Sequence, residues 1–267
     1  MLASYSICAW CGRNFDGRDS PRGARRYCCR RHARLSTRTR LSRWSHDARG
    51  RPIAHFIHIG KTAGTAVSTA LRASAATGDY KIMMQPHGVR LADLPADDSF
   101  FFVVRDPVSR FVSGFLSRQR QGKPTGDSPW RPWEAEAFSL FGTADALGRA
   151  LGAGGEAQQR AEQAMRAISH VNRSYWYWFG DEEHLRKRAG KLLWIGRQES
   201  LDLASLAVVL GLGELVLPSD SKHTNRAPAG STPTLSAEAA ASLRHWYRRD
   251  YEFLAFCEQL QSEGLVR

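Results

Sequence analysis

The stretch IAHFIHIGKTAGTAVSTALRASAA (residues 53–76) decides the fold. It opens with an apolar run of strand length (53–59) and continues, after a few small residues, into a run of good helix formers (66–76). A tight turn from strand to helix points backbone N–H groups and the positive end of the helix dipole at an anion, and Lys61 adds a full charge there. The stretch therefore predicts an α/β protein with a phosphate-binding turn. The alternative is an ordinary strand–helix turn with a surface lysine.

The turn contains Gly60-Lys61-Thr62, which matches the second half of the ATP-binding pattern G-x-x-x-x-G-K-[ST]. The pattern requires a glycine five residues before Gly60, and His55 stands at that position. The motif is therefore broken at its first turn, and the bound nucleotide has to be decided from other parts of the chain. We interpret His55 and His58 as packing or shaping residues of the predicted strand.

The chain has 267 residues with 42% apolar composition, which suffices for one large α/β domain and a small appendage. No apolar run is long enough to predict a membrane span, and the N-terminus lacks the pattern of a signal peptide, so a cytoplasmic location is the default expectation. Residues 1–51 hold 13 Arg, no Lys and 3 Asp, a net charge of +10, whereas 25 Lys and Arg face 23 Asp and Glu in the remainder. This change in charge predicts an Arg-rich segment at 1–48 and an α/β domain at 49–267.

Four of the five cysteines lie within residues 8–29, and Cys8-x2-Cys11 followed by a later Cys/His pair has the spacing of a structural zinc site. The predicted ligands are Cys8, Cys11, Cys28 and His32, with Cys29 as an alternative to Cys28. Zn²⁺ would supply the folding energy that so short and basic a segment cannot obtain from a core. The alternative is a disordered basic tail with incidental cysteines.

This N-terminal segment resembles small treble-clef or ribbon-like zinc knuckles of the form C-x2-C-G-x-x-F…R-x-Y-C. Many such knuckles bind nucleic acid, and the arginines provide a face that attracts phosphate. An anionic glycan, an acidic lipid surface or a protein would be attracted equally well, and these partners stay open.

A second informative stretch is SFFFVVRDPVSRFVSGFLSR (99–118), a predicted strand followed by a helix. Asp106 occupies the position of an N-cap and Pro107 that of the first helical residue. Arg105 ends the strand, where ligands bind in open α/β sheets, and Ser113 lies on the following helix. Arginine and serine here suit a second phosphate, one that the Lys61 turn cannot reach. The alternatives are a local Arg105–Asp106 salt bridge and a solvated serine.

Together, HFIHIGKTAGTA and FFVVRDPVSRFVSGF resemble the sulfotransferase superfamily that uses 3′-phosphoadenosine 5′-phosphosulfate (PAPS), in its carbohydrate branch of uronyl 2-O-sulfotransferases acting on heparan and dermatan. The resemblance implies a P-loop-NTPase-like parallel sheet flanked by helices. It also implies two groups of ligands: Lys61, Thr62, Gly64 and Thr65 for the 5′-phosphosulfate, and Arg105 and Ser113 for the 3′-phosphate. Gly60 departs from the family, which usually has proline there.

Weaker similarity extends over three further stretches, so that the resemblance covers about residues 53–257. These are LLWIGRQESLDLASLAVVLGL (192–212), expected to be a strand, a turn and a helix, KHTNRAP (222–228), and LRHWYRRDYEFLAF (243–256), expected to be one closing helix.

Sulfuryl transfer needs a cation near the leaving oxygen and a base for the acceptor hydroxyl. Lys61 can supply the cation. The family places a histidine between its two phosphate motifs, and His87 fits that position as the general base, the alternative being a loop histidine packed by Pro86. His170 is the second choice as a base or a contact to the acceptor.

The resemblance implies an acceptor hydroxyl on a saccharide or a lipid-linked glycan. The loop QGKPTGDSPWRPWE (121–134) and the cluster SYWYWF (174–179) supply aromatic rings that suit a sugar or fill the core. The leading hypothesis is thus a PAPS-dependent sulfotransferase. Two rivals stay open: an ATP- and Mg²⁺-dependent phosphotransferase, and a nucleic-acid-binding protein whose α/β body is inactive.

Overall fold

The structure, a computed structural model, describes residues 50–74, 77–124, 126–217 and 234–266, together with two short strands, β1 (Tyr5–Ile7) and β2 (Asn14–Asp16). These two strands pair antiparallel. The predicted zinc ligands Cys8, Cys11, Cys28 and His32, and the stretch 222–228, lie outside the described residues.

A parallel sheet of four strands forms the centre of the fold, in the order β4-β3-β5-β6. The strands are β3 (Ile53–Ile57), β4 (Lys81–Met84), β5 (Ser99–Val104) and β6 (Leu192–Arg197). The chain runs from β3 to β4 on one side and then to β5 on the other, so the strand order reverses between β3 and β5. Open α/β sheets bind ligands beyond the carboxyl ends of their strands at such a reversal.

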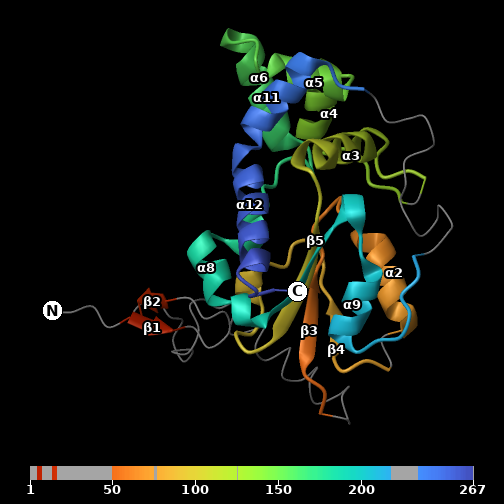
Figure 1. The fold of residues 1–267 in the computed structure, drawn as a ribbon. Coiled ribbons are helices and arrows are strands. Elements are labelled where there is room, and N and C mark those ends of the chain that lie inside the picture. The colour runs from red at the N-terminus through yellow and green to blue at the C-terminus, as the bar shows by residue number, and fades with distance from the viewer. Residues whose placement is uncertain are drawn as a thin grey trace.

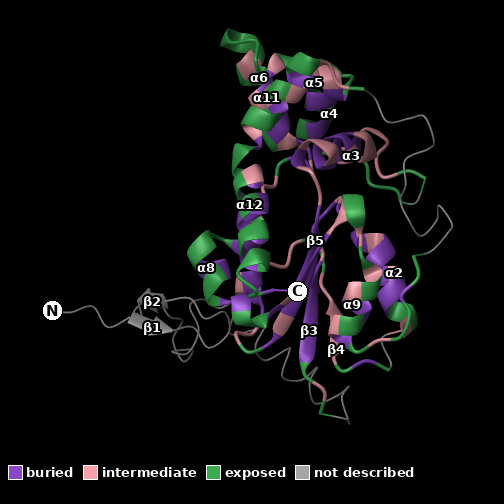
Figure 2. Ribbon diagram, in the orientation of Figure 1, coloured by how far each residue is buried: buried purple, intermediate pink, exposed green. Residues whose placement is uncertain are grey.

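Successive side chains of each strand point to opposite faces of the sheet, and helices cover both faces (Figures 1 and 2). Phe101 and Val103 point to one face, where they pack with residues of α2 (Gly64–Ser74) and α9 (Leu203–Leu210). Phe100 and Phe102 point to the other face. Its covering helices are α7 (Trp176–Phe179), α8 (Glu182–Lys187) and α12 (Arg248–Ser262). The fold is therefore a parallel α/β sheet flanked by helices, as expected from the sequence.

A separate helical region stands at the carboxyl end of the sheet (Figure 1). It consists of α3 (Pro107–Gln119), α4 (Pro132–Leu140), α5 (Ala144–Ala150), α6 (Gly155–Ala167) and α11 (Ala237–Trp246). These helices share their own core, in which Phe115 packs on Phe138. Three short 3-10 turns complete the described elements: η2 (Leu91–Asp93), η3 (Ala189–Lys191) and η4 (Gln198–Ser200).

The prediction of one closing helix over 243–256 is wrong, because α11 ends at Trp246 and α12 begins at Arg248. The two helices pack in different cores, since Leu243 packs within the helical region and Phe253 packs against the sheet. By contrast, the predicted strand, turn and helix over 192–212 are confirmed as β6, η4 and α9. None of the described helices is both long and apolar enough to cross a membrane.

Candidate functional site

The turn between β3 and α2 is wound tightly, and two of its non-glycine residues are left-handed. Lys61 has φ 72° and Ala63 has φ 65°, whereas Thr62 between them does not have positive φ. Backbone that alternates in hand in this way forms a concave nest of N–H groups suited to an anion. Each left-handed residue costs roughly 1–3 kcal/mol, which the surrounding structure has to sustain. Such strain is characteristic of binding turns.

Thr62 and Gly64, both predicted to contact the phosphosulfate, also have structural roles in this turn. The buried Thr62 hydroxyl donates to the Ile59 carbonyl at 3.1 Å, so its hydrogen is already committed within the turn. A Cβ atom on Gly64 would lie 2.1 Å from the His58 ring. Only glycine therefore admits the imidazole at this position. Thr65 follows as the second residue of α2.

Positively charged arginine side chains surround Lys61. Burial lowers the pKa of its ammonium to about 8, assisted by the charges of Arg120, Arg105 and Arg118. Among the residues that the structure describes, the Lys61 side chain has neither a hydrogen bond nor an ion pair. A partly buried cation beside further cations and away from carboxylates favours an anionic ligand.

Arg105 lies next to Lys61 across the strand reversal. Its Nη1 donates to the Lys61 carbonyl at 3.4 Å, and its buried Nε has no hydrogen-bond partner within the described ranges. Burial lowers the pKa of this guanidinium. Tyr175 anchors the Arg105 backbone from both sides, because its hydroxyl accepts from Arg105 N at 2.9 Å and donates to Arg105 O at 2.6 Å. The structure thus places the Arg105 guanidinium against the Lys61 turn, whereas the sequence assigned Arg105 to a second phosphate beyond the reach of that turn.

The helix after Arg105 begins as expected. Asp106 caps α3 by accepting from Ser109 N at 2.7 Å, with Pro107 at the first turn, and the second Asp106 oxygen accepts from the Tyr251 hydroxyl at 2.8 Å. Ser113 lies half-buried further along α3, and the described residues show no contact between it and Lys61 or Arg105.

Three imidazoles meet beside the turn. The rings of His58 and His87 lie 4.0 Å apart, centroid to centroid, and those of His87 and His170 lie 6.0 Å apart. Burial lowers the pKa of His58 and of His170 to about 3, assisted by neighbouring cations and by the other imidazoles. Burial also lowers the pKa of His87, although the hydrogen bond to His58 opposes it. All three rings are therefore neutral at pH 7.

The geometry fixes which His87 nitrogen carries the proton. Its Nδ1 lies 3.1 Å from the His58 carbonyl oxygen, and a carbonyl only accepts, so Nδ1 is the protonated nitrogen. Nε2 then keeps a lone pair. The His87 carbonyl accepts from Trp178 Nε1 at 2.9 Å and Arg173 Nη1 at 3.3 Å, which holds the loop in place. Sequence reasoning considered Trp178 only as one ring of the cluster SYWYWF, for an acceptor contact or the core, and did not single out Arg173.

A cavity of about 150 Å³ opens beside His87. Its lining joins the turn, the His87 loop and the segments around 131 and 169–178, through Gly60, His87, Arg131, Ser169, His170, Asn172, Arg173 and Trp178. A Cβ atom on Gly60 would lie 3.0 Å from His170 Nδ1 and 4.0 Å from His87 Nδ1. Glycine at position 60 thus gives the His170 ring room beside the turn, whereas His87 would lie at an ordinary contact distance from a Cβ atom. His55, by contrast, is buried in the sheet and bonded to Asp98 at 3.0 Å, as a packing residue.

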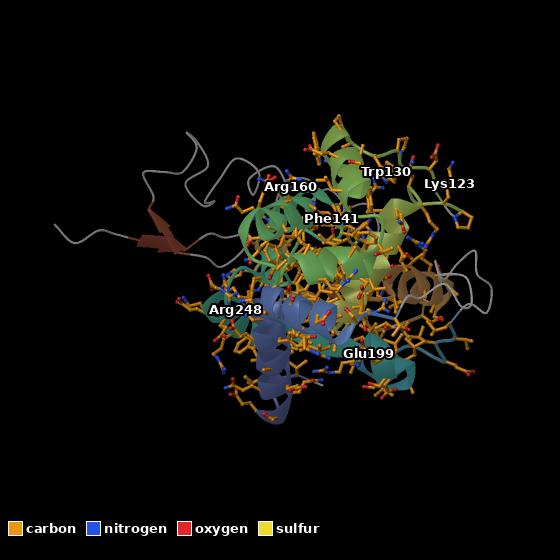
Figure 3. All side chains as sticks on the ribbon, turned by 90° about the horizontal axis from the view of Figure 1, so that it is seen from above. Lys123, Trp130, Phe141, Arg160, Glu199 and Arg248 are labelled. Carbon is orange, nitrogen blue, oxygen red and sulfur yellow. The ribbon has the colours of Figure 1, made fainter. Side chains whose placement is uncertain are left out.

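Most of the predicted aromatic contacts to the acceptor belong to the core. Trp130 stacks on Phe138 with centroids 4.9 Å apart, and Figure 3 shows Trp130 and Lys123 at the same edge of the helical region. Two rings remain exposed, Trp133 (51%) and Tyr177 (37%). Each lies under an arginine of the cavity, since Arg131 covers Trp133 and Arg173 covers Tyr177. Within the cluster SYWYWF, the buried rings are Tyr175, Trp176, Trp178 and Phe179.

The described residues contain no group of three His, Cys, Asp or Glu side chains that could hold a metal ion. Comparison with protein-family models finds no match, and no curated protein sequence matches the chain.

Proposed function

We propose that the protein transfers a sulfuryl group from PAPS to an acceptor hydroxyl. One observation carries the proposal: the Lys61 ammonium, which no carboxylate compensates among the described residues, lies near the neutral imidazole of His87. Lys61 has no carboxylate partner in the described part of the chain, and His87 keeps a lone pair on Nε2 because its Nδ1 donates to the His58 carbonyl. Anion binding and proton removal are the two demands of sulfuryl transfer.

The turn offers the donors that a 5′-phosphosulfate needs. Backbone N–H groups of the left-handed residues Lys61 and Ala63 and the N-terminus of α2 supply a cradle, and the Lys61 ammonium supplies charge. The buried, unpartnered Nε of Arg105 suits a further phosphate oxygen. Ser113 is proposed as a ligand of the 3′-phosphate on the sequence resemblance alone.

The residues then have distinct roles in the reaction. When bound, PAPS supplies an activated sulfuryl group on a phosphate leaving group. His87 Nε2 takes the proton of the acceptor hydroxyl while the acceptor O–S bond forms and the S–O bond to the phosphate breaks. Lys61 stabilises the negative charge that develops on the leaving phosphate oxygen, and 3′-phosphoadenosine 5′-phosphate (PAP) remains. No residue needs to change its oxidation state.

We further propose a saccharide acceptor, or a lipid-linked glycan. The cavity beside His87 is small and polar, and the exposed rings of Trp133 and Tyr177 border it through the arginines stacked on them. Aromatic faces next to polar groups suit sugar rings. Zinc binding by residues 1–48, and their attraction to nucleic acid or another anionic partner, are proposals from the sequence.

ATP-dependent phosphoryl transfer has less support, because Asp106, the carboxylate that directly follows Arg105, is already engaged. Asp106 caps α3 through one oxygen and accepts from Tyr251 through the other, so it is poorly available for Mg²⁺. We found no specific observation that favours this alternative.

Calorimetric titration with PAP, beside ATP with Mg²⁺, tests the proposal. We expect PAP to bind more tightly than ATP. Arg105→Ala should weaken PAP binding by on the order of 10- to 100-fold, since a hydrogen bond to a charged group contributes roughly 1.5–3 kcal/mol. Arg186→Ala is the matched control, because this arginine pairs with Glu263 on the surface. Preference for ATP, or no binding of either nucleotide, would refute sulfuryl transfer.

A further inference from the structure

A buried ion pair lies behind the cavity. Glu134 stands in the first turn of α4 and Arg118 in the last turn of α3, and their side chains are 1% and 6% exposed. Arg118 Nε and Nη2 each donate to a different Glu134 oxygen at 2.8 Å. The pair is therefore bidentate and shielded from water.

The Glu134 carboxylate also accepts two backbone N–H groups from the cavity wall. Ser169 N donates to one oxygen at 3.0 Å, and Arg131 N donates to the other at 3.2 Å. Both of these residues line the cavity beside His87. Burial by itself raises the pKa of Glu134, but the hydrogen bonds from Arg118 and from these backbone groups outweigh it and lower the pKa to about 2. The carboxylate is thus charged at every physiological pH.

Arg118 fixes the loop that leads to Arg131 with its remaining groups. Its Nη1 donates to the Ser128 carbonyl at 3.0 Å and to the Ser128 hydroxyl at 3.1 Å. Its carbonyl accepts from Trp130 Nε1 at 2.6 Å. One ion pair therefore ties together α3, the loop that leads to Arg131, and the segment that carries Ser169.

The residue after Ser169 is His170, whose backbone conformation is strained. His170 is left-handed, with φ 69°, and its ring approaches Gly60 in the turn. Strained backbone persists only where its surroundings hold it. A buried ion pair is weak evidence of stabilisation, because apolar side chains could pack α3 on α4 as well. Apolar side chains could not accept hydrogen bonds from the backbone N–H groups of Arg131 and Ser169, whereas the Glu134 carboxylate does.

We propose that Glu134 is a positioning residue that holds His170 and the acceptor side of the cavity against the Lys61 turn. Here the acceptor side is the wall of the cavity that carries Arg131, Ser169 and His170, and its role in binding the acceptor rests on the proposed function. The position of His170 does not depend on which reaction the protein catalyses, so the positioning role of Glu134 and the sulfotransferase proposal can fail separately.

The test compares Glu134→Gln with a matched control, Leu206→Ala, which removes buried volume from the core on the α2 and α9 face. Nitrogen-15 correlation spectra of the imidazole rings, recorded from about pH 3 to about pH 8, report the environment of His170. Charged and titratable groups that act on His170 are Lys61 in the turn, His87 in the adjoining loop, Arg118 on α3 and Arg173 in its own segment.

In the wild type we expect His170 to stay neutral down to acidic pH. In Glu134→Gln the released segment should expose the ring, so its pKa should rise by at least about one unit toward the ordinary value of about 6.5. Leu206→Ala should leave the titration of His170 unchanged even if the variant melts earlier. An unchanged His170 titration in Glu134→Gln would overturn the proposal, and so would an equal shift in the control.

If Glu134→Gln does not fold, Glu134→Asp keeps both charges of the pair but shortens the side chain by one methylene, so the same His170 titration tests the anchoring. PAP titration separates the two hypotheses. Wild-type protein that fails to bind PAP refutes sulfuryl transfer and leaves the His170 measurement valid. If Glu134→Gln lost affinity for PAP and Leu206→Ala did not, Glu134 would also support the nucleotide site, which would contradict a role confined to the acceptor side.

Discussion

The Nδ1 atom of His87 lies 3.1 Å from the carbonyl oxygen of His58, and this contact joins the loop after β4 to the turn after β3. It selects the tautomer whose Nε2 accepts a proton, in the way that a backbone carbonyl orients many catalytic histidines. The neighbouring ring of His58, packed at 4.0 Å, keeps the imidazole in place.

His87→Ala should reduce sulfuryl transfer by roughly 10²–10⁴-fold, the usual contribution of a general base. PAP should still bind, because its proposed ligands Lys61 and Arg105 are untouched. The measurement is the rate of transfer from PAPS to an acceptor found by screening desulfated polysaccharides, beside a PAP titration. His245→Ala, at an exposed position on α11, is the control. Full turnover in His87→Ala would remove the base from the mechanism.

The affinity for PAP should fall as the pH rises through about 8. Burial and the nearby arginines lower the pKa of Lys61 to about 8, so the free site loses its ammonium charge above that pH. A bound anion favours the protonated form, and binding above that pH must therefore take up a proton. Calorimetry in buffers of different ionisation enthalpy measures this uptake. Lys61→Arg keeps the charge at all these pH values and should abolish the dependence; a dependence that persists would assign it to another group.

Gly64→Ala should destabilise the turn, because the new methyl group would lie 2.1 Å from the His58 ring. Overpacking of this kind costs roughly 1–3 kcal/mol in the free energy of unfolding. Chemical denaturation of Gly64→Ala, His58→Ala and the double variant forms a cycle. The double variant should recover most of the stability lost on adding the methyl group. Purely additive losses would mean that the two residues do not compete for the same space.

Tyr175→Phe should weaken PAP binding without unfolding the protein. The substitution removes the hydroxyl that bonds both Arg105 N and Arg105 O, and leaves these two partly buried backbone groups without that partner, at a cost of up to about 1–3 kcal/mol each. Tyr247→Phe is a matched control, since its buried hydroxyl bonds the Val171 carbonyl instead. Calorimetry should show weaker PAP binding in the first variant only. Equal affinity in both would indicate that Arg105 needs no anchoring.

Features set by short stretches of sequence could be predicted. The strand and helix around the Lys61 turn follow from local propensity, although β3 ends at Ile57 instead of residue 59 and α2 begins at Gly64 instead of residue 66. The start of α3 follows from capping chemistry at Asp106 and Pro107 and lies where the sequence placed it. The two helices at the C-terminus were predicted as one, because no local signal marks the break at Tyr247. The zinc-ligand prediction lies outside the described residues.

By itself, then, the sequence determined a parallel α/β sheet with Lys61 and Arg105 at the ends of two strands, because side-chain periodicity and turn chemistry act over a few residues. Tertiary structure alone decided the surroundings of the base. His87 meets a carbonyl 29 residues away, and Glu134 receives a backbone N–H 35 residues away. Contacts at such separations arise from how the helical region packs on the sheet, and periodicity along the chain carries no record of that packing.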